Sequence, residues 1–210
     1  MPGYPIELNL SDKTVLVVGL GRVGRRKAES LVAAGAHVVA VDPAASGIEP
    51  IVGAEIRNVP YCAEQLHGIS LVVSAAPAEV NRQVVADARA AGVWVGSASE
   101  PEMGDFKIPA IWRKGPVTLT VSTSGASPAL AVVLRDRAAQ AIGPAAVGLT
   151  ALLEEIRPLV RARVTDPETR RRLLSEYAEP QWLDLWSSQG PEAVRRRLLE
   201  RLEDAERPPY

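Results

Sequence analysis

Apolar residues in the first half of the chain form short runs separated by polar segments. The strand-like runs occupy residues 14–18, 37–41, 54–59, 70–76 and 93–95. Two of the stretches between them have helical character, residues 25–34 and 78–91. Runs that are apolar throughout are typical of strands covered on both faces, and helices between them indicate parallel strands with right-handed crossovers.

The pattern changes after about residue 104. Strand-like segments at 106–112 and 117–121 flank Arg113-Lys114-Gly115-Pro116, which predicts a turn between antiparallel strands. A helix is then expected from Pro128 to about Ile142, with Ser127 as its N-cap. Further helices are expected at 149–164, 167–178, 180–187 and 191–205, and residues 5–10 read as an edge strand.

The first apolar run leads directly into a Gly-x-Gly-x-x-Gly turn. Gly19 permits the tight turn, Gly21 lets the backbone approach a pyrophosphate, and Gly24 lets the following helix pack on the sheet. The helix start then faces the phosphates with free N–H groups. Asp42 directly follows the second run. A carboxylate at this position accepts hydrogen bonds from the ribose hydroxyls of NAD and repels the 2′-phosphate of NADP. The pattern predicts a dinucleotide site that prefers NAD to NADP, a preference that Arg22 and Arg25 oppose.

Composition narrows the remaining choices. The chain has 210 residues, 47% of them apolar, and a net charge of −1, which is typical of a soluble globular protein and disfavours nucleic-acid binding. No membrane-length run or secretory pattern is present, so a cytoplasmic protein with no membrane partner is expected. Cys62 is the only cysteine, and His37 and His67 the only histidines. We therefore expect no metal site and look to carboxylates, hydroxyls or water for acid–base chemistry.

Several longer motifs carry a family resemblance. They are Pro5–Leu10, Val15–Lys27, Ala75-Ala76 with Val80-Asn81 and Val84, Pro101-Glu102 with Phe106-x-x-Pro109-Ala110, Val121-Ser122, Gly125-x-Ser127-Pro128-x-Leu130-Ala131 and Leu134-Arg135. With these in place, essentially the whole chain resembles the siroheme-synthase N-terminal family, precorrin-2 dehydrogenases of which some are also sirohydrochlorin ferrochelatases. The resemblance implies NAD-dependent oxidation of precorrin-2, a tetrapyrrole, to sirohydrochlorin.

The resemblance also assigns site residues. For the NAD cofactor it implies Gly19, Gly21, Arg22, Val23, Gly24, Asp42, Ala75, Ala76 and Asn81. For the carboxylates of the substrate, hydroxyls and N–H groups at a helix start and one cation are candidates: Ser122, Thr123, Ser124, Gly125, Ser127 and Lys107. Simple helix capping is the alternative role of the serine-rich loop, and the two roles are compatible.

One stretch departs from the family pattern. Related enzymes carry an aspartate after the fifth strand, and Ser99 stands at that position in Gly96–Pro101. A serine hydroxyl is no carboxylate base near neutral pH. We therefore predict Ser99 and Asp105 as the catalytic candidates, with Asp105 ahead of Glu100, and a dehydrogenase whose chelatase activity is weak or absent. The alternatives are a bifunctional dehydrogenase and ferrochelatase, an NAD-sensing regulatory domain without chemistry, and another small-substrate NAD dehydrogenase.

The expected fold class is α/β. It consists of a Rossmann-type NAD-binding domain over residues 1–112, a small dimerisation region over 113–148 and a helical C-terminal region over 149–210. Segment 106–121 and helix 128–142 hold more Val, Leu and Ala than one chain of this size covers. Exposed apolar patches of this kind mark association surfaces, so a homodimer is expected.

Overall fold

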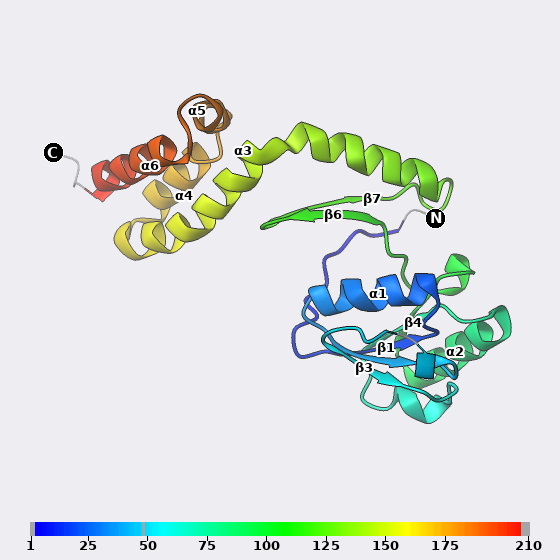
Figure 1. The fold of residues 1–210 in the computed structure, drawn as a ribbon. Coiled ribbons are helices and arrows are strands. Elements are labelled where there is room, and N and C mark those ends of the chain that lie inside the picture. The colour runs from blue at the N-terminus through cyan, green and yellow to red at the C-terminus, as the bar shows by residue number, and fades with distance from the viewer. Residues whose placement is uncertain (1–2, 48, 207–210) are drawn as a thin grey trace. The chain divides into compact units, whose positions relative to one another are not determined.

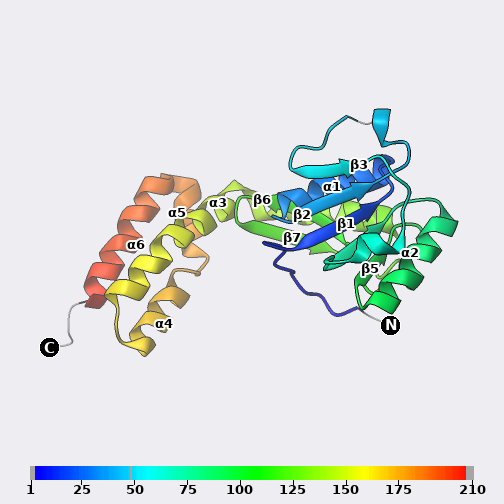
Figure 2. The ribbon, with the colours of Figure 1, turned by 90° about the horizontal axis from the view of Figure 1, so that it is seen from below.

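The computed structural model describes residues 3–47 and 49–206, which form two compact units (Figures 1 and 2). Unit 1 comprises residues up to Ile108, and unit 2 begins at Pro109. Unit 1 contains β1 (Thr14–Val18), α1 (Arg22–Ala33), β2 (His37–Val41), η1 (Ala45–Gly47), β3 (Ala54–Arg57), η2 (Ala63–Leu66), β4 (Leu71–Ser74), α2 (Ala78–Ala91), β5 (Trp94–Ser97) and η3 (Pro101–Met103). Unit 2 contains β6 (Ala110–Lys114), β7 (Val117–Val121), α3 (Pro128–Arg163), α4 (Pro167–Glu176), α5 (Gln181–Gln189) and α6 (Pro191–Glu206).

Unit 1 is a parallel five-stranded sheet in the order β3-β2-β1-β4-β5. Successive residues of each strand point to opposite faces of the sheet, so one apolar core forms on each face. Val15 and Val17 pack with Ala28 and Leu31 of α1, whereas Leu16 packs with the α2 face. Figure 1 shows α1 covering one face of the sheet and α2 lying on the other. The predicted Rossmann-type sheet is confirmed.

The expected edge strand at Pro5–Leu10 was wrong. These residues pair with no strand of the sheet, whose described edges are β3 and β5. Only Leu10 of this segment is buried, in the core beneath α1. The lead-in is thus held by a single apolar anchor, and its alternating pattern reflects no strand pairing.

The expected strand at 106–112 begins later than predicted, at Ala110. Phe106 and Ile108 instead pack against the core of unit 1. The ring of Phe106 lies over Gly96, where an added Cβ would be 2.6 Å from Cε2 of that ring. This contact explains why β6 starts only at Ala110. At its other end, Lys114 pairs with Val117 across a turn that begins at Gly115, whose φ is +52°. A glycine with positive φ suits the first central position of such a two-residue hairpin turn.

Unit 2 begins with the β6–β7 hairpin, which packs against the first half of α3 (Figure 1). The helix is interrupted at Gly143, whose φ of 66° and ψ of 174° are not helical. Pro144 then opens a second helical segment, because proline is tolerated at a helix start but not within one. The predicted end near Ile142 is confirmed, and the expected next helix begins at Pro144 rather than at residue 149.

The second half of α3 forms a helical bundle with α4, α5 and α6, shown side by side in Figure 2. The bundle has its own apolar core, which includes Ile156, Val160, Leu198 and Leu202. Tyr177 crosses this core and donates a hydrogen bond from its hydroxyl to the carbonyl of Leu198 at 2.5 Å. The expected helical region is present as far as residue 206, and residues 207–210 lie outside the described part. None of the described helices is long and apolar enough to cross a membrane.

A tight contact between Gly148 and Trp186 generates a stability prediction. An added Cβ at Gly148 would lie 2.2 Å from Cζ2 of Trp186, so α5 would have to shift. Replacing a mid-helix glycine by alanine ordinarily stabilises a protein by about 1 kcal/mol. Here we expect Gly148→Ala to lower the free energy of unfolding by about 1–3 kcal/mol because of overpacking. Denaturant unfolding measures this, and a stabilised variant would contradict the contact.

Candidate dinucleotide site

The turn after β1 is built from two close backbone approaches. Gly19 has φ +89°, and a Cβ there would lie 2.7 Å from the carbonyl oxygen of Ala75. A Cβ on Gly24 would lie 1.8 Å from the carbonyl oxygen of Gly19. The third residue of α1 must therefore be glycine for the helix to pack this closely on the turn. The two glycines let β1, α1 and the end of β4 meet at the carboxyl edge of the sheet.

The start of α1 remains open between these contacts. Gly21 is its N-cap, and an added Cβ at Gly21 would meet nothing within 4 Å. No side chain caps the helix, and its first turn contains no acidic residue. Anions bind at such helix starts because unpaired N–H groups and the helix dipole favour negative charge. The geometry fits the pyrophosphate of a dinucleotide.

Asp42 follows β2 at the same edge and is tied to the glycine turn. Its Oδ2 accepts a hydrogen bond from the backbone N–H of Leu20 at 2.7 Å, and its Oδ1 accepts one from Ala44 at 2.8 Å. A carboxylate oxygen has more than one lone pair, so both oxygens retain acceptor capacity for ribose hydroxyls. Asp42 therefore holds the glycine turn and retains free lone pairs at the carboxyl edge of the sheet.

The basic residues near the turn differ in their availability. Arg22 and Val23 are exposed in the first turn of α1, as a cofactor contact requires. Arg25 instead forms a 3.0 Å ion pair with Glu29 and donates a hydrogen bond to the carbonyl of Glu49 at 2.6 Å. Burial, and secondly the charge of Arg26, lowers the pKa of Lys27 on the same helix. Arg22 and Arg25 are the two arginines that would favour NADP. Within the described part of the chain, Arg25 has these partners and Arg22 has none.

Asn81 connects the turns that follow β4 and β5 at the carboxyl edge of the sheet. It is 1% exposed, and its Oδ1 accepts hydrogen bonds from the Ser74 hydroxyl and from the Ala76 N–H at 3.0 Å. Its Nδ2 donates to the Ala76 carbonyl and to the Ser99 hydroxyl, both at 2.7 Å. The amide's donors are both used, so Asn81 fixes the Ala75-Ala76 turn and ties it to the segment after β5. Sequence reasoning named the residue but missed this network.

The two predicted catalytic residues lie in different surroundings. Ser99 is exposed at the carboxyl edge, beside the Ala76 turn that Asn81 holds. Asp105 lies beside the middle of β5, where its Oδ2 accepts a hydrogen bond from the Val95 N–H at 2.9 Å. The backbone N–H of Asp105 also donates to the Val95 carbonyl at 2.7 Å. The structure thus places Ser99 beside the Ala75-Ala76 turn, whereas Asp105 is bonded through its side chain and its backbone to Val95 of β5.

The serine-rich loop of unit 2 is held by its own hydrogen bonds. Ser127 caps α3 by accepting a bond from the Leu130 N–H at 3.1 Å, and the Thr123 hydroxyl bridges both backbone groups of Ser127. Ser122 accepts a bond from the N–H of Ser124, which has φ +54°. Ser124 and Gly125 are exposed at the tip of this loop. The capping role is therefore present, and exposed groups remain for an anion.

Lys107 is exposed in unit 1, on the segment between η3 and β6.

The two histidines lie at the opposite edge of the sheet from the glycine turn. His37 begins β2, and His67 precedes β4, so both belong to the amino ends of the parallel strands. Neither is placed for chemistry at the cofactor turns.

Comparisons with known proteins agree with this geometry. Residues 6–110 match the family model described as "Putative NAD(P)-binding". Siroheme synthases from Chromobacterium violaceum and Tolumonas auensis are 36% and 31% identical over 96% and 97% of this chain. The chain belongs to the siroheme synthase N-terminal family. It spans 44% of the length of each of these two relatives.

A solved structure shows the same fold. The chain matches "SirC, precorrin-2 dehydrogenase" with a TM-score of 0.75, covering 96% of this chain and 100% of that one. The two sequences are 23% identical, so this likeness supports the architecture of an α/β sheet, a hairpin and a helical region.

Gly21 and Gly24 form a matched pair for testing the site. Gly21→Ala places its Cβ in open space, so the fold should remain stable while the added methyl keeps a pyrophosphate from the backbone. We expect its NAD dissociation constant to rise about tenfold or more, equivalent to losing roughly one charge-assisted hydrogen bond. Gly24→Ala should instead destabilise unit 1 by more than about 3 kcal/mol through its backbone clash.

Thermal unfolding and fluorescence titration with NAD separate the two effects. A Gly21→Ala variant that binds NAD like wild type would contradict the placement of the pyrophosphate. A Gly24→Ala variant of unchanged stability would contradict the close contact itself.

Proposed function

We propose that this chain is a precorrin-2 dehydrogenase that uses NAD to form sirohydrochlorin. The observation that carries the proposal is the open, uncapped start of α1 at Gly21, within a chain that shares over 30% identity with siroheme synthases. Bound NAD would supply the hydride acceptor of this oxidation. The chain itself supplies binding, orientation and a destination for the released proton.

The residues of unit 1 divide the cofactor-binding work. The N–H groups at Gly21, Arg22 and Val23 face the pyrophosphate, and Asp42 accepts bonds from the adenosine ribose. Asn81 does not use its amide on the cofactor but holds Ala75 and Ala76 beside Gly19. Asp42 favours NAD over NADP because its carboxylate repels a 2′-phosphate, and Arg25 is occupied by Glu29.

The substrate is a flat macrocycle with several carboxylates. The exposed tip of the Ser122–Ser127 loop, at the start of α3, offers hydroxyl and N–H donors that suit a carboxylate. Lys107 offers a cation on unit 1. These assignments apply to the substrate's carboxylates the same helix-start chemistry that is proposed for the pyrophosphate at α1.

A turnover assay tests the proposed function. Purified protein mixed with precorrin-2 and NAD should convert the visible spectrum to that of sirohydrochlorin while absorbance of the reduced nicotinamide appears. With NADP in place of NAD, we expect kcat/KM to fall at least about tenfold, one unfavourable charge contact being worth roughly 1–2 kcal/mol. NAD binding without any spectral change would instead favour a regulatory NAD sensor.

We further propose that metal chelation by this chain is weak or absent. Inserting a metal requires removal of the inner protons of the macrocycle, and Ser99 stands where the family resemblance implies an aspartate. Incubation of sirohydrochlorin with ferrous or cobaltous ion should therefore give the same rate with and without the protein. Ser99→Asp is the matched variant, and we expect it to raise the insertion rate. Protein-dependent insertion by the wild type well above background would contradict the proposal.

A homodimer is the remaining part of the proposal. Leu130, Val133 and Leu134 on the first half of α3 are 49%, 48% and 42% exposed, and no residue of the β6–β7 hairpin is fully buried. The hairpin covers only one side of this helix, so these exposed side chains form a further apolar surface, which a second copy would cover.

Light scattering tests the association. Wild type should have about twice the 22.4 kDa mass of one chain at micromolar concentration. Val133→Glu should shift the protein toward that single-chain mass, whereas the control Glu154→Gln, on the later part of α3, should not. A monomeric wild type would contradict the dimer.

A further inference from the structure

Glu100 holds a buried carboxylate oxygen that nothing in the protein satisfies. Among buried side-chain atoms of residues 3–47 and 49–206, its Oε2 is the one that has no hydrogen-bond partner. The other oxygen, Oε1, lies 3.8 Å from Nε of Arg82. A buried carboxylate oxygen without a donor costs free energy that a hydrogen-bonded one does not. The Glu100 side chain is 30% exposed, so rotation of its carboxylate can turn this unpaired oxygen toward a ligand that brings its own donor.

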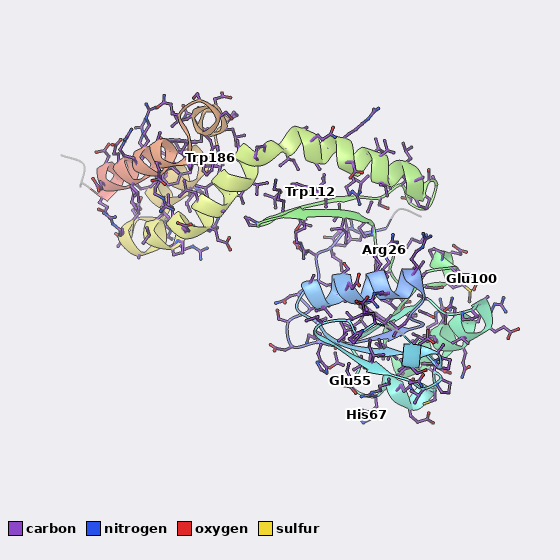
Figure 3. The ribbon with its side chains drawn as sticks, viewed as in Figure 1. Arg26, Glu55, His67, Glu100, Trp112 and Trp186 are labelled. Atoms are coloured by element: carbon purple, nitrogen blue, oxygen red, sulfur yellow. The ribbon has the colours of Figure 1, made fainter. Side chains whose placement is uncertain are left out.

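The backbone around Glu100 places this oxygen at the carboxyl edge of the sheet. The N–H of Glu100 donates to the hydroxyl of Ser97, the last residue of β5, at 3.2 Å. The adjoining Ala98 N–H donates to the Ser74 carbonyl at 2.8 Å, at the end of β4. Ser99, next to Glu100, is bound by Asn81. Figure 3 shows Glu100 on the segment that joins β5 to η3.

The same segment is thereby linked to the proposed cofactor turns. Asn81 joins Ser99 to Ala76, and Ala75 touches both Gly19 and Gly24. Glu100 is thus one residue from a hydrogen-bonded chain that ends at Ala76, next to the residue that packs on the glycine turn. Arg82, one residue after Asn81, is 57% exposed, so the Oε1 side of the pair meets water.

The other proton acceptors of unit 1 are less suitable. The carboxylate of Asp105 is engaged by the Val95 N–H, two residues before β5 ends. Within the described residues, the Ser99 hydroxyl bonds to the amide of Asn81 and to no carboxylate or imidazole that would activate it. His37 and His67 lie at the amino edge. Glu100 is the carboxylate at the carboxyl edge whose inner oxygen is unoccupied.

We propose that Glu100 is the proton acceptor of the dehydrogenation, an inference that rests on the proposed function. Oε2 accepts a hydrogen bond from an N–H of the macrocycle. The substrate then loses a C–H bond, whose hydrogen and electron pair leave as hydride to the oxidised nicotinamide. It also loses the N–H bond, whose proton passes to Oε2. The oxidation releases one proton, which one carboxylate accepts and returns to water on its Arg82 side.

The first test is Glu100→Gln, which keeps the size of the side chain and removes its basicity. We expect kcat to fall about 100-fold or more, the usual contribution of a positioned base, with NAD affinity unchanged. The wild-type rate should fall at acid pH as the acceptor becomes protonated, and this acid limb should disappear in the variant. Glu102→Gln, an exposed carboxylate of η3, is the matched control and should retain wild-type kcat and acid limb.

The second test is chemical rescue. Glu100→Ala leaves space for a small acid, so formate should restore turnover in proportion to its concentration, whereas chloride at equal ionic strength should not. A residue that only supports the fold would show no such rescue. Thermal unfolding of both variants identifies any loss of structure, and Glu100→Asp, which keeps the base, should then retain more activity than Glu100→Gln.

The outcomes separate this inference from the function beneath it. If wild type does not oxidise precorrin-2 with NAD, the proposed function fails. If wild type is active and Glu100→Gln keeps both its rate and its acid limb, the assignment of Glu100 fails alone. Loss of activity that neither formate nor Glu100→Asp restores also overturns the assignment, because it marks a structural role.

Discussion

The contact between Gly24 and Gly19 is the constraint on which the rest of unit 1 depends. With 1.8 Å between the carbonyl oxygen and a would-be Cβ, α1 can start beside β1 only because residue 24 has no side chain. That placement directs the helix start toward the carboxyl edge and gives Asp42 the Leu20 N–H as a partner. It also lets Ala75 approach Gly19. The dinucleotide site is therefore a consequence of how tightly one helix packs on one strand.

Much of this arrangement could be predicted from the sequence, because it depends on local patterns. Apolar runs such as Val15–Val18 predict strands buried on both faces, and the glycine spacing identifies the turn that follows. Gly143-Pro144 marks an interruption of α3 for a similarly local reason. The expected strand at Pro5–Leu10 failed because alternation says nothing about whether a neighbouring strand is present to pair with it.

The remaining features depend on contacts between distant residues. Nothing in the sequence near Phe106 shows that its ring lies over Gly96, so the start of β6 was misjudged. Asp105 was predicted as a catalytic candidate, and only the fold reveals its bond to Val95. The buried oxygen of Glu100 has the same origin, since its environment comes from β5, α2 and η3 together. Site chemistry is thus set by tertiary contacts, even where the cofactor turn is readable from a motif.

The bonding of Asp105 to Val95 has a consequence for solubility. β5 is the last strand of the sheet, and unpaired N–H and C=O groups on such a strand invite addition of a strand from another molecule. Asp105 occupies both groups of Val95, one with its side chain and one with its backbone. The folded chain thereby occupies the backbone groups in the middle of its own edge strand, which disfavours the addition of a strand from another molecule.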